Sequence, residues 1–121
     1  MESLSISEMA QSTGLSVHTL RYYERIGLIT AIPRAASGHR RYRETDVGWV
    51  DFLHKLRSTG MPIRDMCTYA EMLRQGPETA DARQALLEAH GERVRARIAE
   101  LAACLVNIDY KIERYQRGEF K

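Results

Sequence analysis

The spacing of apolar residues near the start of the chain predicts two short helices. Residues 5–8 read SISE, the spacing of a capping box, in which a serine hydroxyl and a glutamate carboxylate each accept from a backbone N–H at the start of a helix. That helix should end at Gly14, because glycine readily takes the left-handed conformation of a helix end. Ser16 is a second N-cap candidate for a helix over residues 17–26, which Gly27 should end. The pattern predicts a helix-turn-helix.

The pattern changes after this pair of helices. Proline and a Ser-Gly step exclude a regular helix over residues 33–42 and predict two extended arms around a turn, a hairpin or wing. Two further helices are expected, from Asp46 to about Ser58 and from Pro62 to Arg74.

From Thr79 to about Gln116 there is no proline, and apolar residues follow alternating steps of four and three from Val94 onward. This spacing is typical of a coiled-coil seam. The predicted dimerisation residues are Leu87, Val94, Ile98, Leu101, Leu105, Ile108, Ile112 and Tyr115. A helix of this length would span roughly 55 Å, which is too long for the front domain alone to cover. Its apolar seam therefore needs a partner. We expect a homodimer; the alternative is a helix folded back on its own chain.

Composition limits the class of protein. The 121 residues are 44% hydrophobic and 28% charged, which suits one small domain with an appendage. The longest apolar run, residues 101–106, is too short to span a bilayer, and the first residues do not resemble a secretory signal, so we expect a cytoplasmic protein. Two cysteines 37 positions apart form neither a disulfide framework nor a metal knuckle, and the four histidines lack ligand spacing. No motif indicates an enzyme, a metal site or a cofactor.

The charge is unevenly distributed. Residues 1–43 carry a net charge of +3 and residues 44–121 a net charge of −1. Between residues 16 and 43, six arginines face the single acid Glu24. This distribution suggests that the front half meets a polyanion, although a solvated cationic face is the alternative on charge alone.

Two strings in this basic region resemble a known family. TLRYYERIGLI at residues 19–29 and SGHRRY at residues 37–42, with the spacing between them, are similar to the MerR family of bacterial transcription regulators. The two helices and the long helix that should follow also fit this family. The resemblance covers essentially the whole chain.

The resemblance implies a mainly α fold with a winged helix-turn-helix over residues 1–76, and a dimerisation helix with a short tail over residues 77–121. Two such helices would form an antiparallel coiled coil in a homodimer. The expected partners are double-stranded promoter DNA, a second copy of the chain and RNA polymerase, with no membrane. Such regulators bind a pseudo-palindrome and distort the DNA to control transcription initiation. The alternative is an architectural DNA-binding protein with weak sequence preference.

Residue chemistry and the resemblance together select the candidate DNA contacts. The start of the second helix should enter the major groove, where Arg21 could contact guanine or phosphate. Basic side chains of the wing should neutralise phosphates, and tyrosine hydroxyls could bond to them. Leu20 should lie in the core, one of Tyr22 and Tyr23 should pack within the protein, and Trp49 should be a core or seam residue. The full candidate set is Ser16, Val17, His18, Thr19, Arg21, Tyr22, Tyr23, Arg40, Arg41 and Tyr42.

The inducing signal, the operator and the direction of regulation stay open. Residues 56–61 and 105–112 resemble the short-chain subgroup of the family, which lacks a separate effector domain. Some of its members respond to aldehyde or nitrosative stress through a cysteine on the helix after the wing, but here that helix reads FLHK at residues 52–55. The candidate redox residues are Cys67, for which we favour the alternative of a small buried hydrophobe, and Cys104, which lies beside the seam and could approach its copy in a dimer.

Overall fold

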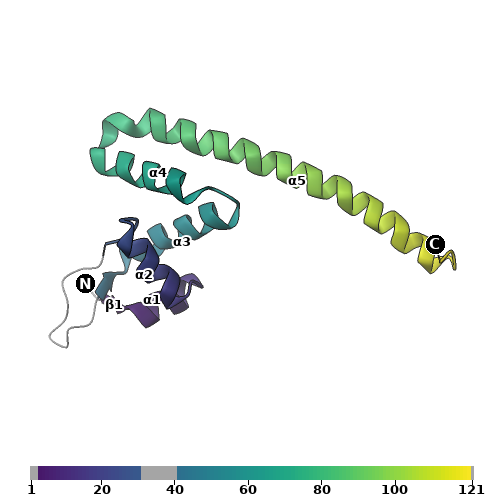
Figure 1. Cartoon of the computed structure of the whole chain (residues 1–121), viewed down its shortest axis with the longest axis horizontal. Helices are drawn as coiled ribbons and strands as arrows, with labels where there is room; N and C mark the ends of the chain where they lie inside the picture. Colours follow the sequence, from purple (N-terminus) through teal and green to yellow (C-terminus); the bar gives the residue numbers. More distant parts are fainter. Residues whose placement is uncertain (1–2, 31–40, 121) are drawn as a thin grey trace. The chain divides into compact units, whose positions relative to one another are not determined.

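The computed structural model describes residues 3–30 and 41–120 and is mainly helical (Figure 1). Its elements are β1 (Ser3–Ser5), α1 (Ile6–Thr13), α2 (Val17–Arg25), β2 (Arg41–Arg43), α3 (Thr45–Ser58), α4 (Ile63–Gln75), the 3-10 turn η1 (Pro77–Thr79) and α5 (Ala80–Gln116). The chain forms two compact units, Met1–Arg83 and Gln84–Lys121, and α5 runs through the division. The sequence-based boundary at residues 76–77 follows the end of α4 and stays a prediction.

The first helix begins and ends as the sequence predicts. The backbone N–H of Ser5 donates to Glu8 Oε1 (2.9 Å), and the backbone N–H of Glu8 donates to Ser5 Oγ (3.1 Å). These reciprocal bonds confirm the capping box. They also hold the pKa of the fully exposed Glu8 carboxyl below its usual range, with the backbone bond from Ser5 as the main cause. At the other end Gly14 takes a φ of 76°, in the left-handed region.

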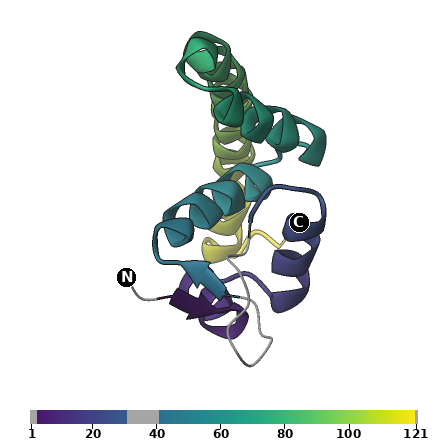
Figure 2. The same ribbon diagram turned by 90° about the vertical axis from the view of Figure 1, so that its left-hand side faces the viewer.

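A small antiparallel sheet joins the beginning of the chain to the wing region (Figure 2). Its register pairs Ser3 with Arg43, Leu4 with Tyr42 and Ser5 with Arg41. The sequence indicates an extended segment at residues 41–42 but not its partner β1. The rest of the predicted hairpin, including Arg40, lies outside the described residues.

The core of the first unit lies where α1 packs against α2 and α3. Leu20 is fully buried, which confirms its predicted place in the core. Other fully buried side chains come from α1, β2, α3, α4 and the segment between α3 and α4: Met9, Tyr42, Val50, Leu53, Met61 and Met66. Leu20 therefore anchors α2 in this core.

Helices α3 and α4 form close to their predicted bounds. Pro62 is the N-cap of α4, with extended backbone (φ −61°, ψ 146°), rather than its first helical residue. The indole of Trp49 on α3 stacks on the ring of Tyr69 on α4, with ring centroids 6.1 Å apart. This aromatic contact links the two helices across their turn.

The predicted long helix is present as α5, which runs without a break for 37 residues (Figure 1). At 1.5 Å per residue its length is roughly 55 Å. Across residues 3–30 and 41–120, no helix is both long and apolar enough to cross a membrane.

Candidate nucleic-acid interface

The second helix of the helix-turn-helix is fixed at both ends by local bonds. At its start Ser16 Oγ accepts from the backbone N–H of Thr19 (3.0 Å), as expected of an N-cap. At its end the N–H of Leu28 donates to Tyr23 O (2.8 Å) and the N–H of Gly27 donates to Glu24 O (3.2 Å). This is the Schellman arrangement, and the φ of 83° at Gly27 suits a glycine. Helix α2 therefore has defined limits.

One face of α2 is exposed along its whole length. The exposed side chains are His18, Arg21, Tyr22 and Arg25, spaced at i, i+3, i+4 and i+7, so they share one face of the helix. We call these four residues the exposed stripe. The Arg25 guanidinium lies over the Tyr22 ring, 5.8 Å from its centroid. The stripe contains two arginines and no acid, and it is therefore a cationic surface of the kind that meets phosphate and base edges.

The acid nearest to the stripe in sequence is engaged on another element. Glu24 Oε2 accepts a hydrogen bond from the Tyr42 hydroxyl of β2 (2.8 Å). This bond joins α2, the helix that should enter the major groove and is called the recognition helix below, to β2, which is called the wing strand. It also shows that the prediction of a phosphate contact from the Tyr42 hydroxyl is wrong, because the ring is fully buried and the hydroxyl bonds within the protein.

The paired tyrosines of α2 have different environments, as the sequence predicts. Tyr23 is 3% exposed and belongs to the core, whereas Tyr22 is 37% exposed. Burial raises the pKa of the Tyr23 hydroxyl, and the positive charge of Arg57 opposes this shift. The prediction that Tyr23 offers its hydroxyl to phosphate is therefore corrected: the neutral, buried ring packs within the domain.

The remaining candidate contacts divide between surface and partly buried positions. Ser16 is exposed, while Val17 and Thr19 are half-buried beside the stripe. Arg41 is half-buried, and its Nε and Nη2 donate to Ser3 Oγ (2.9 Å) and Ser3 O (2.8 Å). Two of the five guanidinium donors thus hold this side chain on β1.

Arg25 of the exposed stripe is absent from the candidate contacts predicted from the sequence. Its place on the stripe could have been found from its spacing of seven residues after His18, which returns to the same face after two turns.

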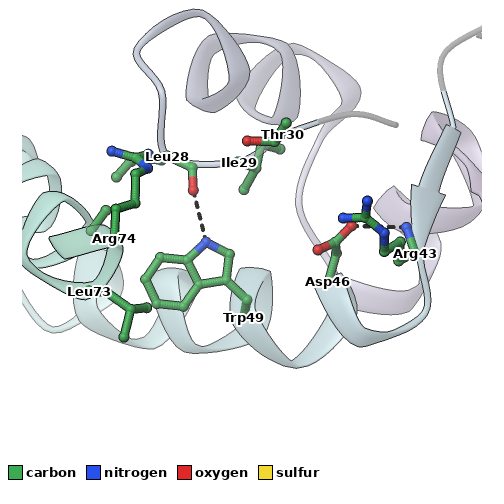
Figure 3. Close-up of a pocket in the computed structure, with 9 residues that line it drawn as sticks. Leu28, Ile29, Thr30, Arg43, Asp46, Trp49, Leu73 and Arg74 are labelled. Atoms are coloured by element: carbon green, nitrogen blue, oxygen red, sulfur yellow. Dashed lines mark hydrogen bonds between the residues drawn. The ribbon is translucent and has the colours of Figure 1, made fainter. Parts of the chain in front are cut away.

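A pocket of about 270 Å³ lies next to the turn that follows α2 (Figure 3). Its wall includes Trp49, whose Nε1 donates to Leu28 O (2.8 Å), and Arg74, whose Nη2 donates to Gly27 O. Arg43 and Asp46 lie at its other end, where Asp46 Oδ2 accepts from the Arg43 backbone N–H (2.9 Å). Trp49 is half-buried and bonded to the backbone, so it stabilises the turn, a role that its sequence position does not predict.

The predicted seam of α5 is mostly uncovered. Leu87 and Val94 are half-buried, whereas the six seam residues from Ile98 to Tyr115 are 47% to 60% exposed. Both cysteines are free thiols: Cys67 on α4 is half-buried and Cys104 on α5 is exposed. Among the residues that the structure describes, no group of three or more metal-ligating side chains is arranged to hold an ion.

The helix-turn-helix with its cationic second helix and the small wing sheet place the chain in the winged helix-turn-helix class of DNA-binding proteins. The long helix α5 follows this domain. Comparison with known proteins specifies the family. Residues 4–73 match the family described as MerR HTH family regulatory protein, and residues 47–110 match the one described as MerR, DNA binding. The chain belongs to the MerR family.

Individual relatives agree with this assignment. An uncharacterized HTH-type transcriptional regulator of Haemophilus influenzae is 34% identical over 113 residues, which are 93% of this chain and 84% of that protein. The HTH-type transcriptional regulator AdhR of Bacillus subtilis is 36% identical over 91 residues, 75% of this chain and 65% of that protein. Among solved structures, the chain resembles HiNmlR, a MerR family regulator lacking the sensor domain, bound to promoter DNA. The TM-score is 0.86 and the identity 32%, with 98% of this chain and 94% of that chain covered.

Proposed function

We propose that this protein binds a pseudo-palindromic promoter as a homodimer and distorts the DNA to control transcription initiation by RNA polymerase. The observation that carries the proposal is the exposed stripe, a cationic face on the second helix of a helix-turn-helix. The promoter DNA bound to HiNmlR, which shares the fold over nearly the whole chain, supports the same partner.

The stripe offers both kinds of contact that a specific site needs. Arg21 lies in the first half of α2, the part that enters the major groove in helix-turn-helix proteins, and a guanidinium can donate two bonds to guanine. Arg25 lies one turn later, where a cation would meet phosphate. The other candidate contacts at the start of the helix are Ser16, Val17, His18, Thr19 and Tyr22. On the wing side, Arg40 and Arg41 supply phosphate contacts.

The exposed seam of α5 supports the proposed dimer. Six large apolar side chains at coiled-coil spacing are about half exposed, which is costly for a helix that stays alone in water. A second α5, antiparallel to the first, would cover these side chains and present two copies of the stripe to the two half-sites of a palindrome. Bending a site of 20–30 base pairs costs of order 1–6 kcal/mol, which contacts from two such domains can offset.

The test is binding of the reduced protein to labelled DNA from immediately upstream of its own gene, with a scrambled fragment of equal length as the control. We expect two protomers per fragment and a Kd lower by at least about 1,000-fold on the upstream fragment. Arg21→Ala should reduce this preference, with Lys55→Ala on α3, whose side chain is exposed and ion-paired to Asp51, as the matched control. Equal affinity for both fragments would instead indicate an architectural protein with weak sequence preference.

A further inference from the structure

The turn after the recognition helix is held by side chains from two other helices. Leu28 and Ile29 are 2% and 5% exposed, so the chain leaving α2 enters the core immediately. The carbonyl groups of Gly27 and Leu28, which follow one another in the chain, accept hydrogen bonds from side chains of α4 and α3. Figure 3 shows the bond to Leu28. Leu28 is buried, and a buried backbone carbonyl needs such a partner.

The two donors are Arg74 on α4, which bonds to Gly27 O, and Trp49 on α3, which bonds to Leu28 O. We call this pair the carbonyl clamp. The Trp49 indole is held by stacking on Tyr69. Arg74 Nη1 also forms an ion pair with Glu71 Oε2 (3.0 Å), but these side chains are 51% and 60% exposed, so the pair contributes little to the position of Arg74. Through the carbonyl clamp, the positions of α3 and α4 determine the position of the backbone at the end of α2.

We propose that Trp49 and Arg74 are positioning residues for DNA recognition: they fix the rotation of α2 about its axis, so that the exposed stripe meets the base edges in one register. This inference rests on the proposed function. Neither residue belongs to the stripe, and each acts through the backbone of the turn rather than through DNA. Their substitution therefore changes sequence discrimination more than affinity for phosphate.

The difference between the two effects follows from geometry. A bidentate contact to a base edge requires donor and acceptor distances near 2.9 Å and nearly straight bonds, so a small rotation of α2 weakens it. A phosphate contact from a long arginine tolerates such a rotation, because the charge acts over a longer distance and the side chain can adjust. A variant that merely unfolds part of the protein lowers the active fraction and reduces binding to every DNA equally.

The experiment compares Kd on the upstream and scrambled fragments for Trp49→Phe and Arg74→Met, at two salt concentrations and with the active fraction measured. Trp49→Phe keeps an aromatic ring against Tyr69 but removes the N–H donor, and Arg74→Met removes the guanidinium. We expect each variant to lower the ratio of the two affinities by roughly 10-fold, the loss of one base contact, with an unchanged salt slope. Arg74→Lys, which keeps a donor, should recover part of the ratio. Glu71→Gln is the matched control, because it removes the ion pair of Arg74 but not the bond to Gly27.

The outcomes separate this inference from the function on which it rests. If the unsubstituted protein does not prefer the upstream fragment, the proposed function fails. If it does, and both variants keep its affinity ratio within twofold, the inference is overturned. An equal loss of affinity on both fragments overturns it too, as does a loss in Glu71→Gln as large as that in Arg74→Met.

Discussion

The bond between the wing strand and the recognition helix gives a direct test of the structure. Tyr42→Phe removes a single hydroxyl and keeps the fully buried ring, so the packing of the core should not change. What is lost is the 2.8 Å hydrogen bond from Tyr42 to the Glu24 carboxylate. The sequence-based alternative, in which this hydroxyl contacts phosphate, predicts a loss of DNA affinity with no loss of stability.

The size of the effect follows from the nature of the acceptor. A partly buried hydrogen bond to a charged group contributes about 1.5–3 kcal/mol, roughly twice the value of a bond between neutral groups. For a chain of this length the unfolding entropy gives a change in Tm of about 4 °C per kcal/mol, so we expect a decrease of about 6–12 °C.

The assay is urea unfolding at equal protein concentrations, because the stability of the proposed homodimer depends on concentration. Tyr22→Phe, on the same helix but exposed, is the control and should change the free energy of unfolding by less than about 0.5 kcal/mol. A double-mutant cycle with Glu24→Ala, which removes the acceptor, should give a coupling energy of at least about 1 kcal/mol. If Tyr42→Phe costs less than about 0.5 kcal/mol, or if the coupling energy is near zero, the bond does not stabilise the domain and the reasoning is refuted.

Four further predictions concern separate parts of the molecule. Gly27→Ala places a side chain at a φ of 83°, so it should cost about 1–2 kcal/mol in urea unfolding, and an unchanged midpoint would contradict the Schellman end of α2. Burial raises the pKa of the Tyr23 hydroxyl, so Tyr23 contributes stability that is fully present below about pH 10 and is lost as the pH rises through the folded-state pKa. Tyr23→Phe should reduce this loss of stability at alkaline pH. A stability profile identical to that of the unsubstituted protein would contradict the reasoning. Leu101→Asp introduces a charge into both copies of the seam and should weaken the dimer by at least about 100-fold, which light scattering would detect as monomer; a dimeric variant would contradict the coiled coil. Arg41→Ala should weaken binding to all DNA fragments and reduce the salt slope by about 1, whereas a selective loss on the upstream fragment would indicate base contact.

The sequence predicts the local features of the fold well, because their causes lie within a few residues. The capping box at Ser5 and the N-cap at Ser16 need only a hydroxyl three residues before a backbone N–H. The left-handed end at Gly14 needs only a glycine, and the long helix needs only the absence of proline and a regular apolar seam. Leu20 is placed correctly because the helical period assigns it to the face opposite Arg21 and the other exposed residues.

The features that the sequence does not predict depend on contacts between distant residues. Strand β1 has only three residues, and its partner lies 38 residues further along the chain, so no local pattern marks it. Tyr42 has both an apolar ring and a polar hydroxyl, and only the placement of Glu24 opposite it decides that the hydroxyl stays within the protein. The bonds from Trp49 and Arg74 to the turn join residues 21 and 47 positions apart. The seam, in contrast, is periodic in sequence, and its six residues from Ile98 to Tyr115 are about half exposed in the single chain.

The pairing of Ser3–Ser5 with Arg41–Arg43 has a consequence for the order in which the protein assembles during synthesis. The ribosome completes β1, α1 and α2 before it makes the strand that pairs with β1. Helix α1 can begin at once, since its capping box is local, but the sheet has to wait for the wing and must then close a loop of more than 30 residues. Closing such a loop is slow compared with forming a helical turn. We therefore expect the helix-turn-helix to exist first as two loosely associated helices, which become a rigid DNA-binding surface only when the arginine-rich strand reaches the beginning of the chain.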